Sequence, residues 1–152
     1  MKNLLAALLA LSFAAPAAAE EPKGAGQTPS PRAPTVTFLP DGYRGVSLPV
    51  DGHQLAFIKK GDRVDVLVTF EANMTDAKEK VTATIMQNLV VLDVVKPAKL
   101  TDPGVILLIV NPNEAQYAAL AQIQGTIHIV LRAKGDTKMT PMEMAAFRKL
   151  FK

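Results

Sequence analysis

An alternation of apolar and polar residues in the stretch "RVDVLVTF", which begins at Arg63, constrains the fold more than any other feature of the chain. Val64, Val66 and Val68 recur at every second position, the spacing that places side chains on one face of a β-strand. Arg63 and Asp65 then fall on the opposite face, where they can pair with each other. The stretch therefore predicts a core strand with one buried face and one outward face.

Further apolar runs predict a mainly β domain with one or two short helices. The pair "QN", ending at Asn88, interrupts the alternation of one run and predicts a bulge. The polar stretch over residues 71–80 predicts a hairpin loop. Additional strands are expected where apolar residues recur between turn signals, at residues 43–51, 81–95, 105–110 and 126–132.

Two helices are predicted from signals at their N-termini. Asn111 and Glu114 have the spacing of a capping box, and Pro112 fits the first helical position. Gly125 is expected to end this helix in a left-handed conformation. A similar pattern near the C-terminus predicts a short second helix over residues 141–151.

The predicted C-terminal helix is the candidate docking element of the chain. Met144, Phe147 and Phe151 fall on one side at helical spacing, with Leu150 beside them. A helix of this length is marginal in water on its own and must pack against something. We expect it either to cap the domain's own sheet, which is the simpler interpretation, or to dock in a groove of a partner protein.

Gly61 and Asp62 immediately precede the core strand and are predicted to form a structural turn. Glycine tolerates positive φ, and an aspartate side chain can bond to nearby backbone. Asp62, Asp65 and Asp93 could instead supply paired carboxylates for acid–base chemistry. The structural interpretation is favoured, because Asp62 makes the turn, Asp65 faces Arg63, and Asp93 points outward from a strand.

Other catalytic and metal-binding patterns are weak. The histidines are His53 and His128, and Ser47 is the serine inside the expected domain. A set of Ser47, His53 and Asp51 is conceivable, but no nucleophile-elbow motif surrounds the serine. The chain has no cysteine, which excludes disulfides and thiolate metal sites. We therefore predict a non-enzymatic protein without catalytic residues, cofactor or metal.

The N-terminus predicts export and three segments. A basic start, a short alanine-rich apolar run and a small-residue site before Glu20 are typical of a cleaved signal peptide, residues 1–19. The apolar run is shorter than the about 20 residues that span a bilayer. Residues 20–34 are rich in Pro and Gly and predict a disordered tether. Residues 35–152 are then one small domain of a periplasmic protein with no stable membrane span after cleavage.

Charge excludes one class of partner. The formal net charge is +3, and the basic residues are scattered rather than gathered with aromatics. The sequence therefore predicts no nucleic-acid binding.

Several motifs, in order, resemble one known family. "RGVSLPVD" and "FIKKGDRVDVLVTF" are followed by "ATIMQNLVVLDV" and by "VILLIVNPNEAQYAALAQIQGTIHIVLRAKGD". Over about residues 44–136 these resemble the CpaB/RcpC family of Flp (tad) pilus assembly proteins. The resemblance implies a small β-clip or SAF-like domain in the periplasm, without enzymatic activity. It also implies contact with the outer-membrane secretin, or with other proteins of a pilus or type II-like secretion machine, and a possible outer-membrane association.

The resemblance leaves a second interpretation open. SAF-like and β-clip domains elsewhere bind glycans or act as chaperones, so peptidoglycan is an alternative partner. The low aromatic content, 5% with no Trp, argues mildly against a sugar-stacking site.

Overall fold

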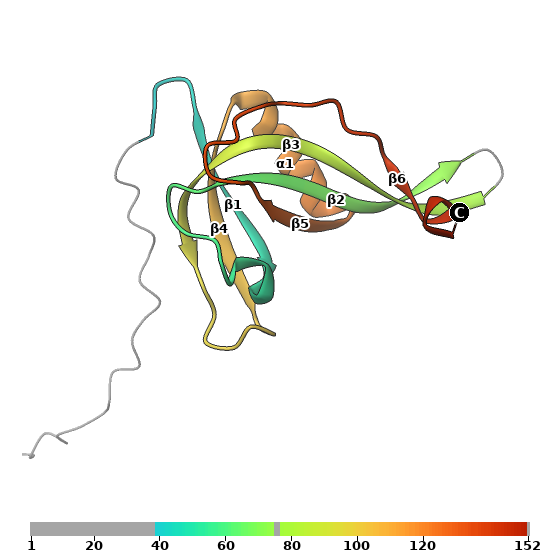
Figure 1. Ribbon diagram of the computed structural model, residues 1–152, viewed down its shortest axis with the longest axis horizontal. Helices are drawn as coiled ribbons and strands as arrows, with labels where there is room; N and C mark the ends of the chain where they lie inside the picture. Colours follow the sequence, from blue (N-terminus) through green and yellow to red (C-terminus); the bar gives the residue numbers. More distant parts are fainter. Residues whose placement is uncertain (1–38, 75–76, 152) are drawn as a thin grey trace, which may run out of the picture. The chain divides into compact units, whose positions relative to one another are not determined.

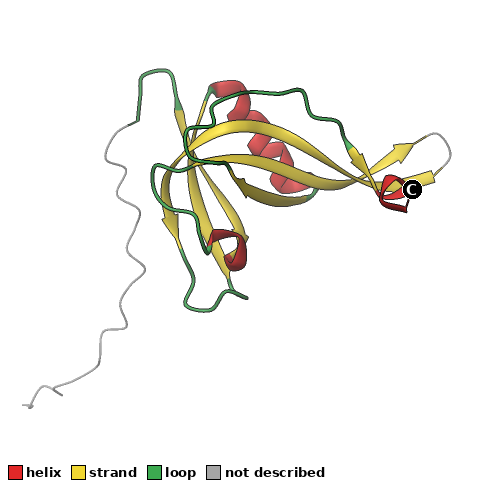
Figure 2. Cartoon of the chain, viewed as in Figure 1, coloured by secondary structure: helices red, strands yellow, loops and turns green. Residues whose placement is uncertain are grey.

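The computed structural model describes residues 39–74 and 77–151 (Figure 1). The predicted signal peptide, residues 1–19, and tether, residues 20–34, lie outside the described residues. Strands dominate the described chain (Figure 2). In chain order the elements are β1 (Arg44–Asp51), the 3-10 turn η1 (Gly52–Leu55), β2 (Arg63–Met74), β3 (Ala77–Val95), β4 (Pro103–Val110), α1 (Pro112–Gln124), β5 (Thr126–Leu131), β6 (Ala145–Ala146) and the 3-10 turn η2 (Phe147–Phe151).

The strands form one antiparallel sheet in the order β1-β4-β3-β2-β5, and β6 pairs with the outer edge of β3. This confirms the prediction of a mainly β fold with one or two short helices, since α1 is the one α-helix among the described residues. The helix α1 begins as predicted, because the Asn111 side chain accepts from the Glu114 N–H and the Glu114 side chain accepts from the Asn111 N–H. It contacts β1, β3, β4 and β5 (Figure 1).

The valine alternation of β2 faces the core, as predicted. Val64 and Val66 are 0% exposed and Val68 is 5% exposed. They pack in one cluster with the buried helix residues Ala118 and Ala121, so α1 covers this face of the sheet. Each buried valine contributes about 1.5–3 kcal/mol of hydrophobic stabilisation to the domain.

The predicted bulge is present at Asn88. Its φ is 60°, and the register between β2 and β3 shifts on both sides of Val66. The bulge turns the backbone N–H of Asn88 toward Asp65, whose Oδ1 accepts it at 2.7 Å. Beyond the bulge, Val90 pairs with both β2 and β4, and from Val91 onward β3 pairs with β4.

Residues 71–80 are not the predicted hairpin loop. β2 and β3 continue their pairing from Glu71↔Lys80 to Met74↔Ala77. The polar composition misled the prediction, because Glu71 and Lys80 are opposite charges on paired positions, which suits an exposed two-stranded ladder.

The conformation predicted for Gly125 is wrong. Its φ is −164° and its ψ is −171°, an extended conformation open to any residue. Glycine fits here for a steric reason: an ideal Cβ would lie 2.3 Å from the carbonyl oxygen of Thr69. The absent side chain lets the chain pass from α1 into β5 against β2.

The second helix predicted over residues 141–151 is also wrong. Ala145 and Ala146 pair with Thr82 and Val81 of β3, and only a 3-10 turn follows. An isolated helix of this length gains too little from its own hydrogen bonds, so pairing with an available strand edge takes precedence.

Candidate functional site

The turn before β2 is built around Gly61 and Asp62. Gly61 has a φ of 87° and nothing lies within 4 Å of its ideal Cβ position. The Asp62 carboxylate accepts from the Lys59 N–H at 2.8 Å, while the backbone of the turn exchanges hydrogen bonds with Val91. The Asp62 side chain therefore closes the turn, and the turn backbone holds it against β3.

Arg63 and Asp65 do not pair with each other, in contrast to the prediction. Arg63 donates to the carbonyl oxygen and to the side-chain oxygen of Asn88, at 3.2 and 2.8 Å. Asp65 instead accepts from Arg132, which donates to both carboxylate oxygens at 2.8 and 2.9 Å. The two side chains are 18% and 7% exposed, so this is a largely buried ion pair that joins β2 to the end of β5.

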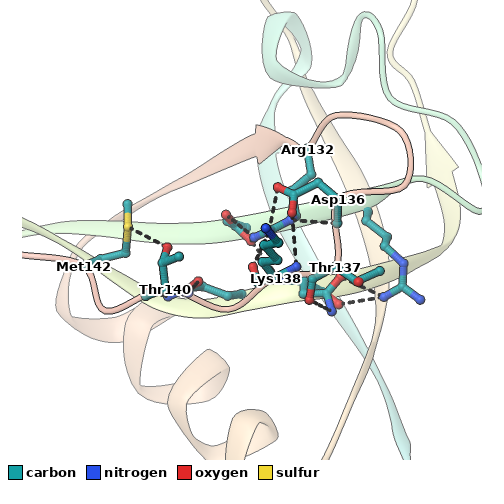
Figure 3. A network of polar contacts seen from close by, with 10 residues as sticks. Arg132, Asp136, Thr137, Lys138, Thr140 and Met142 are labelled. Carbon is teal, nitrogen blue, oxygen red and sulfur yellow. Dashed lines mark hydrogen bonds and ion pairs between the residues drawn. The ribbon is translucent and has the colours of Figure 1, made fainter.

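Arg132 is the centre of a polar network at the start of the C-terminal tail, residues 133–151 (Figure 3). Its guanidinium also donates to the Asp136 carboxylate at 2.8 Å, to the Asp136 carbonyl oxygen and to the Lys138 carbonyl oxygen. We call these contacts, with Asp65, the Arg132 network. They fold the first residues of the tail back over the end of β5.

The network shifts the pKa of two of its members. The hydrogen bond with Asp65 raises the pKa of Arg132 above its ordinary value, despite opposing desolvation. The Lys138 N–H and the Arg132 guanidinium lower the pKa of Asp136. Both groups are therefore held in their charged forms at neutral pH.

Beyond the network the tail runs beside β3. The Asn88 side chain donates to the Thr137 carbonyl oxygen, and Gln87 makes two hydrogen bonds with the Thr140 backbone. Farther along, β6 pairs with β3, and Glu79 accepts from the Arg148 N–H at 3.0 Å.

The candidate docking residues at the C-terminus lie in or just before β6 and η2. Met144 and Phe147 are 51% and 57% exposed, and Leu150 and Phe151 are 70% and 75% exposed. The rings of Phe147 and Phe151 meet edge to face with centroids 5.1 Å apart. These side chains remain on the surface, so they do not form the buried cap that one interpretation of the sequence expected.

The residues considered for catalysis are not assembled into a site. His128 lies in β5 and its Nε2 is 3.1 Å from the Thr69 hydroxyl oxygen. Ser47 and Asp51 are exposed on β1, and His53 is exposed on η1. Within residues 39–74 and 77–151, no hydrogen bond joins any two of Ser47, Asp51 and His53. Over the same ranges no group of three His, Cys, Asp or Glu side chains could hold a metal ion.

An apolar groove lies between α1 and the β2–β3 hairpin, with a volume of about 260 Å³. Gln124 and the Tyr117 hydroxyl supply the polar groups among its side chains. Tyr117 and Leu120 are each 56% exposed, and Ile123, one turn on, is 81% exposed. We call this surface the α1 groove; its remaining lining residues are Val68, Phe70, Ile85 and Ala121.

A comparison with protein-family models matches residues 34–132 to the family described as Flp pilus assembly protein RcpC/CpaB. The chain belongs to the RcpC/CpaB family. Family membership assigns the chain to Flp pilus assembly, as the sequence motifs indicated. No curated protein and no solved structure matches the chain.

The residues matched to the RcpC/CpaB family include the α1 groove but not the C-terminal tail. The match contains β1 to β5, the helix α1 and therefore the whole α1 groove. It ends at Arg132, so the C-terminal tail lies outside the matched residues. Among the described residues, no helix is both long and apolar enough to cross a membrane.

Proposed function

We propose that this RcpC/CpaB protein is an exported periplasmic accessory of Flp pilus assembly that acts by contact with other assembly proteins, the outer-membrane secretin first among them. Two independent observations support this. The family match gives the assembly role, and the leader-like N-terminus before Glu20 supports export.

The α1 groove is the observation that carries a contact role. It is an open apolar surface inside the family-matched residues, with Tyr117, Leu120 and Ile123 exposed along the helix beside it. Large apolar side chains that gather on one exposed surface mark protein contacts more often than isolated ones do. Tyrosine is also enriched at such contacts, because its ring is apolar while its hydroxyl stays hydrated.

The groove favours a protein partner over peptidoglycan or another glycan. A sugar needs several hydrogen-bonding groups around it, and the groove side chains offer Gln124 and the Tyr117 hydroxyl. A protein partner needs only an apolar side chain of complementary shape. We therefore keep the glycan-binding and chaperone roles as alternatives without a supporting observation.

The contact role is tested with a pair of matched leucines. Leu120 is 56% exposed beside the groove, and Leu100 is 54% exposed in the loop before β4. We expect Leu120→Asp to reduce recovery of the secretin with the tagged protein from cells at least about ten-fold, while Leu100→Asp leaves it unchanged. Equal recovery with both variants would show that the α1 groove is not the contact surface.

Export is tested separately. The mature protein should begin at Glu20 and be released with the periplasmic fraction. Mass spectrometry that finds residues 1–19 retained in a membrane fraction would contradict the proposal.

A further inference from the structure

The C-terminal tail follows β3 in a single antiparallel register well beyond the two paired residues of β6. The ladder joins Val81 to Ala146 and Thr82 to Ala145. Continued without a shift, the same register places Thr140 opposite Gln87 and Arg148 opposite Glu79. These are the pairs that hydrogen bonds connect, at 2.8 Å for Gln87 and 3.0 Å for Glu79. The tail thus lies beside nine residues of β3, 79–87, as an incompletely formed strand.

Side chains of β3 replace backbone groups at both ends of this alignment. The Gln87 amide donates to the Thr140 carbonyl oxygen and accepts from the Thr140 N–H, as the backbone of a neighbouring strand would. The Glu79 carboxylate accepts from the Arg148 N–H and forms an ion pair with the Arg148 side chain at 3.5 Å. The outer edge of β3 therefore offers specific contacts to an extended chain.

The tail is attached only lightly beyond the Arg132 network. Ala146, 6% exposed, is its one buried residue among residues 133–151. Neither Ala146 nor Val81, which it covers, belongs to the main core cluster. Five other apolar side chains of residues 142–151 are more than half exposed: Met142, Met144, Phe147, Leu150 and Phe151. Release of the tail from β3 would therefore leave the core of the domain in place.

The family match gives a second reason, independent of the contacts, to treat the tail as separate from the β3 edge that it covers. Residues 34–132 include all of β3, but the tail begins only at residue 133. Among the described strands, β6 of the tail is the only one that pairs with β3 between Val81 and Asn88 on the side away from β2. A strand edge left without a partner readily accepts an extended peptide.

We propose that residues 79–87 of β3 form a strand-addition site, which the chain's own tail occupies until an extended segment of a partner protein replaces it. The tail itself defines the chemistry of that segment. It has a small residue opposite Val81, a basic residue near Glu79 and backbone groups that meet the Gln87 amide. Ile85 belongs to this segment of β3 and also lines the α1 groove, but the strand-addition site is the outer backbone edge of β3, and the inference does not depend on the proposed function.

The test uses the full-length mature chain and a synthetic peptide of residues 139–151 as the probe. Ala146→Asp places a charge against buried Val81 and should detach the tail. The control is Ala145→Asp, because Ala145 is exposed on the opposite face of β6 and its replacement should leave the tail bound. In the wild-type chain the attached tail competes at a local concentration on the order of millimolar.

The peptide should bind Ala146→Asp at least about ten-fold more tightly than it binds the wild-type or Ala145→Asp chains. Amide shifts in nuclear magnetic resonance spectra should then map to residues 79–87, and a peptide carrying the same Ala146→Asp change should not bind. Equal binding to all three chains, or none to any, overturns the proposal.

Three further measurements keep the result interpretable. Loss of the folded spectrum in Ala146→Asp would show that the tail is part of the core, which overturns a releasable tail. In the wild-type chain, the Ala146 amide should exchange hydrogen faster than the Val66 amide of the core, and equal protection would contradict the proposal. A wild-type dimer that dissociates in Ala146→Asp would overturn the choice of a partner protein, because a second copy would supply the strand.

Discussion

Substitution of Gly125 distinguishes two reasons for a glycine at the end of α1. An ideal Cβ on Gly125 would lie 2.3 Å from the Thr69 carbonyl oxygen and 3.0 Å from Cγ2 of Val68. Ordinary contacts of a Cβ atom begin at 3.4 Å, so the overlap with a backbone atom exceeds 1 Å. The φ of −164° costs nothing for an alanine, and the expected penalty of Gly125→Ala is therefore entirely steric.

The size of the penalty follows from how β2 is held at this point. Thr69 pairs with Thr82 of β3 on one side and with Thr126 of β5 on the other, so its carbonyl group cannot easily move away. Added atoms in a packed interior destabilise a protein by about 1–3 kcal/mol. Because the new Cβ meets fixed backbone, we expect Gly125→Ala to lie at the upper end, with a loss of about 3 kcal/mol in the free energy of unfolding. For a domain of roughly 100 residues, that loss lowers the melting temperature by about 10–20 °C.

Asparagine provides the decisive comparison, measured by thermal unfolding followed by circular dichroism. A left-handed cap would tolerate Gly125→Asn better than Gly125→Ala. The steric account expects Gly125→Asn to be at least as damaging as Gly125→Ala. Gly61→Asn is the control, since Gly61 has a φ of 87° with nothing within 4 Å, and it should cost only about 1 kcal/mol. If Gly125→Asn proved as mild as this control, the steric reasoning would be wrong.

Three further predictions concern stability. Val66→Asp should unfold the domain, because the 0% exposed Val66 would become an unpaired buried charge that costs several kcal/mol; a cooperative melt near the wild-type temperature would contradict this. Asp65→Ala should lower the melting temperature more than Asp136→Ala, because Asp65 is 18% exposed and holds both Arg132 and the Asn88 N–H, whereas Asp136 is 44% exposed. The pKa of Asp136 is lower in the folded protein than in the unfolded chain, where it is about 3.9. The Asp136 carboxylate therefore stabilises the fold fully above that unfolded pKa, and this contribution is lost as the pH falls through the folded pKa. The difference in melting temperature between wild type and Asp136→Asn should therefore be present at neutral pH and vanish well below about pH 4, and a difference independent of pH would refute the role of the charge.

Sequence patterns correctly predicted those elements that are set by residues close together in the chain. The valine alternation of β2 identified the buried face, and Asn111, Pro112 and Glu114 identified the start of α1. The "QN" pair before Leu89 marked the bulge. In each case the deciding interactions lie within a few residues of the signal, or depend only on which face of one strand is buried.

Contacts between distant segments set the features that the sequence did not reveal. Asp65 has Arg63 two positions away, yet its carboxylate pairs with Arg132, 67 residues later. The pairing of β2 with β5 sets Asp65 opposite Val130 and so brings the end of β5 within reach. Meanwhile the Asn88 bulge draws Arg63 away to the Asn88 oxygens. Neither the partner of Asp65 nor the partner of Arg63 can be predicted without knowing the register of three strands.

The C-terminal tail shows most clearly how the environment decides between two conformations of one sequence. Met144, Phe147 and Phe151 have helical spacing, and the preceding Pro141 is a reasonable helix start. The same segment carries the small residues Ala145 and Ala146 at positions that an adjacent strand can accept. Because the tail runs from the end of β5 to the outer edge of β3, pairing with that edge takes precedence over a short helix with few hydrogen bonds of its own. The conformation of the tail therefore depends on whether that edge is available, and a partner strand that occupied β3 would remove the interaction that now determines it.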